Sequence, residues 1–178
     1  MSKYAGTKTE QNLMYAFSGE SQARNKYTYF ASAAKKAGFV QMSNIFLETA
    51  EQEREHAKLW FKEFHGIGDV AANLIDAAAG EHEEWTNMYA RMAQEAHEEG
   101  FDELAVKFEM VAKVEEAHEK RYLKLLESYN SGTTFKGDAP LGWKCANCGY
   151  IHYGDEAPDI CPACSHPKAH FERKVENY

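Results

Sequence analysis

The stretches Glu53-Arg54-Glu55-His56 and Glu115-Glu116-Ala117-His118 decide how this chain is expected to fold. Each is a Glu-x-x-His step inside a long segment without proline, where apolar residues recur every three or four positions. Residues i and i+3 share one face of a helix, so each step places a carboxylate and an imidazole on the apolar stripe of its helix. A charged group on a buried stripe is unfavourable unless an opposite charge or hydrogen bonds stabilise it.

The surrounding sequence predicts a mainly α protein. Proline is absent before Pro140, and breaks at Gly38, at Gly66 to Gly68 and at Gly100 separate helical patterns. The expected helices are 7–36, 40–65, 69–99 and 101–130. We predict a four-helix bundle at residues 1–130, a linker at 131–142 and a small cysteine-bearing domain at 143–178.

The two helix pairs are expected to be a duplication with one irregularity. Glu20 and Glu81 each follow a glycine at matching places in the first and third helices. Tyr27 lies seven residues after Glu20, whereas Tyr89 lies eight residues after Glu81. A helix accommodates one extra residue most simply as a π-bulge, a feature often found at functional sites. We predict a π-bulge between Glu81 and Tyr89.

The charged residues on the stripes predict a site for two metal ions. They are Glu20, Glu53, His56, Glu81, Glu84, Glu115 and His118. A lone Glu-x-x-His step is most often a solvated face, but two steps at matched positions, with matched glutamates on the partner helices, reverse that expectation. Buried carboxylates repel each other, and two cations relieve all five together. A Glu from each of two helices plus a Glu-x-x-His from each of the other two is the pattern of di-iron bundles. Mixed oxygen and nitrogen ligands favour iron or manganese.

Three residues near this site have two readings each. Glu84 has no counterpart in the first helix, where Ala23 takes its place, so it is either a surplus ligand or a glutamate that faces solvent or another helix. Tyr27 and Tyr89 either donate hydrogen bonds to the ligand carboxylates or are ordinary core tyrosines.

The four cysteines form a second candidate metal site. Cys145-Ala146-Asn147-Cys148 and Cys161-Pro162-Ala163-Cys164 are two Cys-x-x-Cys pairs separated by twelve residues. Four thiolates bind zinc or a single iron in a tetrahedral site. The motif by itself favours structural zinc, whereas the neighbouring two-metal bundle favours a redox iron. A pair of disulfides is the remaining alternative.

Composition excludes several function classes. The 178 residues are 44% hydrophobic and 27% charged, with a formal net charge of −8, which argues against a nucleic-acid partner. No long apolar run follows the N-terminus, which argues against a signal peptide, and no segment has the roughly 18 apolar residues of a membrane span. We therefore expect a cytoplasmic protein with no membrane partner.

Five stretches spread along the chain carry a close resemblance to the rubrerythrin family, and the resemblance extends over nearly the whole chain. They are Ala16-Phe17-Ser18-Gly19-Glu20-Ser21-Gln22-Ala23-Arg24, Glu51-Gln52-Glu53-Arg54-Glu55-His56-Ala57-Lys58, Gly80-Glu81-His82-Glu83-Glu84-Trp85, Glu115-Glu116-Ala117-His118-Glu119-Lys120-Arg121 and Cys161-Pro162-Ala163-Cys164-Ser165-His166-Pro167. The resemblance implies a ferritin-like di-iron bundle followed by a rubredoxin-like domain.

The resemblance also implies a role for each ligand. Glu53 and Glu115 would bridge the two irons, Glu20 and Glu81 would be terminal ligands, and His118 would be a constant ligand of the second iron. The first iron would bind Glu84 when oxidised and His56 when reduced, which makes these two residues the catalytic pair.

The function implied by the resemblance is a non-haem di-iron peroxidase. It would reduce hydrogen peroxide to water in oxidative stress defence, with Glu84 as our candidate proton donor. The Cys-bound iron, which zinc can replace, would relay electrons from an unidentified donor protein or reductase. A head-to-tail homodimer or a higher oligomer is expected. The alternatives are a ferritin-like ferroxidase, a dioxygen-reducing oxidase and a non-enzymatic zinc-ribbon interaction protein.

Overall fold

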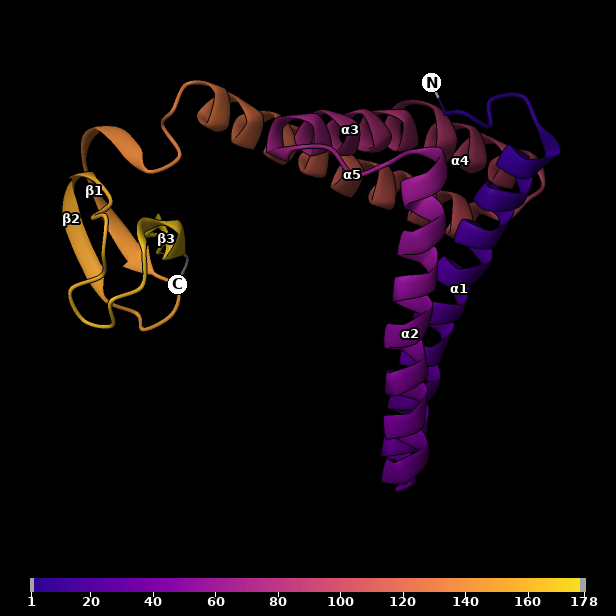
Figure 1. The fold of residues 1–178 in the computed structure, drawn as a ribbon. Helices are drawn as coiled ribbons and strands as arrows, with labels where there is room; N and C mark the ends of the chain where they lie inside the picture. Colours follow the sequence, from indigo (N-terminus) through magenta and orange to yellow (C-terminus); the bar gives the residue numbers. More distant parts are fainter. Residues whose placement is uncertain (1, 177–178) are drawn as a thin grey trace. The chain divides into compact units, whose positions relative to one another are not determined.

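The computed structural model describes residues 2–176, which are mainly helical (Figure 1). The chain divides into two compact units, one ending at Gly68 and the other beginning at Asp69. The first unit contains α1 (Lys8–Lys36) and α2 (Val40–Phe64). The helices of the second unit are α3 (Val70–Glu83), the π-helical turn η1 (Glu84–Met88), α4 (Tyr89–Glu98) and α5 (Asp102–Asn130). The four predicted helical segments are confirmed, because α3, η1 and α4 together occupy the third.

In the first unit, α1 and α2 run side by side in opposite directions (Figure 1). Phe17, early in α1, contacts Phe61, late in α2, with ring centroids 5.3 Å apart. Phe30, late in α1, contacts Phe46, early in α2, at 5.7 Å. Between these aromatic contacts lies Ala50, which is 1% exposed. Its small side chain allows the two helices to pack closely at the level of the predicted ligands.

The first helix of each half ends in the same way. Gly38 follows α1 with φ +86°, and Gly100 follows α4 with φ +82°. In each case the amide of the next residue donates to the carbonyl five residues back, at 2.9 Å and 2.7 Å respectively. This is the Schellman arrangement, which needs the left-handed conformation that glycine adopts without strain. The matching ends support the predicted duplication.

The predicted π-bulge is confirmed at η1. The amide of Tyr89 donates to the carbonyl of Glu84, five residues back rather than four. The extra residue is therefore absorbed in one wide turn between α3 and α4. Helix α5 packs against α3, η1 and α4 and runs antiparallel to them, and its residue Ala105 is fully buried. Glu84 is the first residue of the wide turn.

The cysteine-bearing segment forms a small antiparallel sheet of order β2-β1-β3 (Figure 1). Its strands are β1 (Lys136–Cys145), β2 (Ile151–Glu156) and β3 (Phe171–Arg173), and the 3₁₀ turn η2 (Lys168–His170) precedes β3. On the central strand, Trp143 pairs with His152 on one side and with Arg173 on the other. The core of the sheet consists of Trp143, Cys145, Ala157, Cys161 and Phe171.

The segment expected as a linker, 131–142, overlaps the first strand. β1 begins at Lys136, which pairs with Glu156, and the register shifts before Leu141 pairs with Gly154. Glycine and proline make this stretch look like a connection in the sequence, but its backbone pairs with β2. The exact limits of the linker stay a prediction.

Charged residues are spread along all the helices. Among residues 2–176, no helix is both long enough and apolar enough to cross a membrane.

Candidate metal centres

The first unit brings three predicted ligands together. Glu20 comes from α1, and Glu53 and His56 come from α2; one ligand atom of each lies within 4.8 Å of the others. His56 Nδ1 is 2.8 Å from Glu53 Oε2. The Glu53 side chain is 17% exposed, whereas that of His56 is 52% exposed. The three side chains thus form a half-open group with mixed oxygen and nitrogen donors.

The second unit repeats the arrangement with Glu81 from α3 and with Glu115 and His118 from α5. His118 Nδ1 is 2.7 Å from Glu115 Oε2 and 3.7 Å from Glu81 Oε2. The carboxylates are 14% and 20% exposed and the imidazole is 34% exposed. Each unit therefore holds one Glu and one Glu-x-x-His step, which is half of the ligand set of a di-iron bundle.

The electrostatics of the second group favour a bound cation. Burial raises the pKa of Glu81, and the negative charge of Glu115 raises it further. The imidazole of His118 opposes this shift. A divalent ion among these three ligands would stabilise both carboxylates in the ionised form. The residues therefore fit a metal ion by their spacing and by their charge.

Glu84 lies beside this group without being one of its three members. Its charge contributes to the raised pKa of Glu81 and also, after burial, to the raised pKa of Tyr89. The wide turn thus places a further carboxylate near Glu81. Glu84 is half-buried, which distinguishes it from the exposed neighbour Glu83.

The two predicted tyrosines pack as aromatic rings in the helical units. The Tyr27 ring lies 6.2 Å from that of Phe46, and the Tyr89 ring lies 6.1 Å from that of Phe108, measured between centroids. These contacts fit the reading as core tyrosines. A hydrogen bond from either hydroxyl to a ligand carboxylate stays a prediction.

One polar network beside the second ligand group was not predicted from the sequence. Trp85 Nε1 donates to Glu119 Oε2 at 2.6 Å, and His82 Nδ1 is 3.0 Å from Glu119 Oε1. The hydrogen bond from Trp85 is the main cause of the lowered pKa of Glu119. The network joins α3 and η1 to α5 beside the second ligand group. A signal was present in the duplication, because Glu119 stands where the first half has Ala57.

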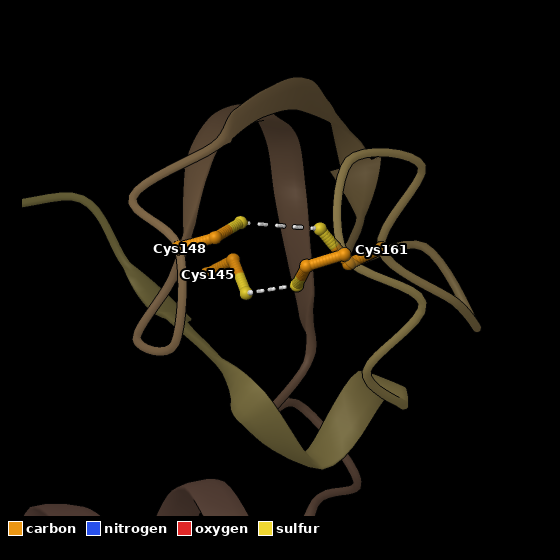
Figure 2. Close-up of side chains that lie close together, drawn as sticks. Cys145, Cys148 and Cys161 are labelled. Atoms are coloured by element: carbon orange, nitrogen blue, oxygen red, sulfur yellow. Dashed lines mark hydrogen bonds between the residues drawn. The ribbon is translucent and has the colours of Figure 1, made fainter.

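The four cysteines lie close together: Figure 2 shows Cys145 and Cys148 facing Cys161, and Cys164 completes the group. Cys145 Sγ is 3.8 Å from Cys164 Sγ, and Cys148 Sγ is 3.7 Å from Cys161 Sγ. Sulfurs at the corners of a tetrahedron around an ion about 2.3 Å away lie about 3.8 Å apart. A disulfide requires about 2.05 Å, and all four cysteines are free, so the disulfide alternative is wrong.

Backbone amides tune the sulfur atoms. The amide of His166 lowers the pKa of Cys164 to about 6. The amide of Tyr150 lowers the pKa of Cys148, but the neighbouring thiols and burial outweigh it and raise that pKa to about 12. Crowded thiols therefore resist joint ionisation, and a central cation removes this conflict because it stabilises all four thiolates. The cysteine group fits a metal ion.

Comparison with known proteins gives matches to the helical part of the chain and to its cysteine-bearing part. A family model described as Rubrerythrin matches residues 11–126, and one described as Rubrerythrin, rubredoxin-like domain matches residues 143–172. The chain is 51% identical to rubrerythrin of Nitratidesulfovibrio vulgaris, with 97% of both chains covered. It is 50% identical to rubrerythrin-1 of Clostridium acetobutylicum, with both chains covered completely. A solved structure of partially reduced nigerythrin is 33% identical, with 97% of this chain and 90% of that chain covered and a TM-score of 0.36.

Proposed function

Because the chain belongs to the rubrerythrin family, with a ferritin-like di-iron domain followed by a rubredoxin-like domain, we propose that it is a non-haem di-iron peroxidase that reduces hydrogen peroxide to water. Each peroxide takes up two electrons and two protons and yields two waters. The proposal rests on one observation: a single chain carries two Glu/Glu/His groups and a four-cysteine group, all with metal-ligand spacing. The physiological role implied by this activity is defence against oxidative stress.

We assign the two Glu/Glu/His groups to the two irons of the centre. Their ligands are Glu20, Glu53, His56, Glu81, Glu115 and His118. Glu84 is assigned as the additional ligand, because the π-turn places it beside Glu81. We further assign Glu84 and His56 as alternative ligands of one iron, in the oxidised and the reduced protein respectively.

The Glu/Glu/His groups would hold two irons, which would supply the two electrons that peroxide reduction needs, and the four cysteines would hold an iron suited to one-electron transfer. The residues of the chain supply positioning and protons. His56 Nδ1 lies 2.8 Å from Glu53 Oε2, so the imidazole and the carboxylate are close enough to bind the same ion. A carboxyl oxygen of Glu84 holds the proton that is delivered to the leaving oxygen.

The cysteine group gives electrons a route from outside. Cys148 is exposed and Cys164 is half-buried, so two of the four cysteines lie close to the surface of the domain. An electron donor protein or a reductase is the expected partner at this surface. A ferroxidase that stores iron has no need of such a relay. The head-to-tail homodimer and the cytoplasmic location stay predictions.

Stopped-flow oxidation of the reduced, iron-loaded protein tests the proposal. We expect peroxide to oxidise the centre much faster than dioxygen does; the reverse order would defeat the peroxidase and favour an oxidase. Glu84→Ala is expected to slow the reaction with peroxide about a hundredfold, the usual contribution of a general acid, while iron content is largely kept. Glu83→Ala is the matched control, since Glu83 is the exposed neighbour on the same turn, and its rate should equal that of the wild type.

A further inference from the structure

A basic groove runs between α1 and α2 in the first unit. It encloses about 450 Å³, and the rings of Phe17 and Phe61 line part of it. The polar lining consists mainly of Arg24, Arg54 and Lys58. None of these three cations belongs to the metal groups described above. Three basic side chains in one groove raise the question of what neutralises them.

Two of the cations are paired within α2. Arg54 contacts Glu51 at 2.6 Å and Glu55 at 3.1 Å, and Lys58 contacts Glu55 at 3.6 Å. All of these side chains are about half exposed, so solvent screens their interactions. Two carboxylates thus face three cations, which leaves one positive charge over in the groove.

Arg24 carries the remaining charge. Its Nε is buried and has no hydrogen-bond partner among residues 2–176. Its Nη1 has one long contact, 3.4 Å to the side-chain oxygen of Asn25, the next residue. A buried guanidinium nitrogen without an acceptor is costly, because the donor has given up its hydration without gaining a bond. Arg24 and Asn25 both line the groove, so the long Nη1 contact lies at its wall and leaves the guanidinium without a strong acceptor there.

The duplication shows which group would fill the position. Trp85 in the second half corresponds to Arg24, since each lies four residues after the first ligand glutamate of its half. Glu119 corresponds to Ala57, since each directly follows a ligand histidine. In the second half the carboxylate of Glu119 accepts the hydrogen bond of Trp85 at 2.6 Å. In the first half Ala57 lines the groove and offers no side-chain acceptor.

We propose that the groove between α1 and α2 binds a small carboxylate, which accepts hydrogen bonds from Arg24 where Glu119 does so in the second half. The planar guanidinium suits a carboxylate, because its donors form a fork that matches two oxygens. Arg54 and Lys58 add positive charge at the rim, and the phenylalanine rings provide apolar walls for a short carbon chain. The site is independent of the iron chemistry proposed above.

Calorimetric titration of the full-length, iron-loaded protein with succinate tests this site. We expect one succinate per chain. Arg24→Gln should weaken binding about tenfold or more, the usual effect of losing a hydrogen bond to a charged group. Arg91→Gln is the matched control, because Arg91 lies on α4, outside the groove, and pairs with Glu95; its affinity should equal that of the wild type. Absence of binding to the wild type, or equal affinity in Arg24→Gln, would overturn the proposal.

A second variant supplies the missing carboxylate from within the chain. Ala57→Glu places a carboxylate at the position that corresponds to Glu119. We expect this variant to melt at a higher temperature than the wild type without succinate, and to have lost the succinate titration. A variant that folds, as judged by its helical circular dichroism, and still binds succinate like the wild type would contradict the assignment of the groove.

Two other sources of an anion give different results. Inorganic phosphate that binds more tightly than succinate would rule out a carboxylate-shaped site. A glutamate or aspartate from a second copy of the chain would fill the groove without any added ligand. In that case the wild type would not bind succinate, and Arg24→Gln would change the sedimentation coefficient, which would also overturn the proposal.

Discussion

Replacement of Trp143 tests whether the small sheet and its metal site fold as one unit. The Trp143 side chain is fully buried, packs with Cys145 and Cys161, and donates from Nε1 to the carbonyl of Gly154 at 3.0 Å. A buried tryptophan removes about 150–250 Å² from water, which contributes about 4–6 kcal/mol at about 25 cal/mol per Å². Truncation of large aromatic side chains in other cores costs about 3–5 kcal/mol.

This cost compares with the whole stability of the module. A domain of this size rarely gains more than about 3–5 kcal/mol from its core, so Trp143→Ala should leave the metal-free module unfolded. The free energy of metal binding must then also drive the folding of the module. The affinity of the module for its metal is lowered by the free energy that this folding requires. At about 1.4 kcal/mol per factor of ten, we expect the affinity to fall between about a hundredfold and a few thousandfold.

Competition with a chelator measures this loss through the sulfur-to-metal absorption of the cysteine site. Helical circular dichroism should be unchanged, because Trp143 packs within the sheet core. Tyr153→Thr is the control: Tyr153 is 67% exposed, and threonine keeps the preference for a strand, so affinity should change by no more than about twofold. Trp143→Ala with an affinity within threefold of the wild type would show that the cysteine turns hold the metal without the core.

Three further predictions concern single contacts. The hydrogen bond to Asp102 raises the pKa of His97 above its usual 6.5. The interaction therefore stabilises the fold fully below pH 6.5, and this stabilisation is lost as pH rises through the higher pKa of the folded state. NMR titration of His97 should show the raised pKa, and Asp102→Asn should return it toward 6.5. In metal-free protein, Cys164, with a pKa of about 6, should be the first cysteine alkylated at pH 7, with a rate that falls below pH 6; mass spectrometry that finds another cysteine labelled first would contradict this. Trp85→Phe removes the donor to Glu119 and should speed amide exchange in the π-turn, while unchanged exchange would mean that the turn is held by its backbone alone.

The features that follow from the spacing of residues along the chain were predicted from the sequence. Helix positions follow from apolar residues three and four apart, and the π-turn follows from one extra residue between Glu81 and Tyr89. The two Glu/Glu/His groups follow too, since i and i+3 share a face within each helix. The spacing within the cysteine pairs likewise indicated their convergence. These features are local, so the order of residues along the chain determines them.

Features that depend on distances between elements were not predictable in this way. The bond from Trp85 to Glu119 joins residues 34 positions apart, and the apolar periodicity of the two helices does not indicate that they meet. The pairing of Lys136 with Glu156 depends on the path of the chain between them, which glycine and proline do not determine. That the Nε of Arg24 is buried without a partner in the described part of the chain becomes known only from the burial of that single atom.

The π-turn also bears on how the two halves diverged. Insertion of one codon in a helical segment normally rotates every later side chain by about 100°, which would misplace all the following contacts. Here Tyr27 precedes Gly38 by eleven residues and Tyr89 precedes Gly100 by eleven, so everything after the insertion keeps its inherited spacing. The wide turn confines the change to a few residues. The third helical segment can therefore carry one more residue than the first, with Glu84 at the start of the wide turn, while the rest of the segment keeps the spacing of the first half.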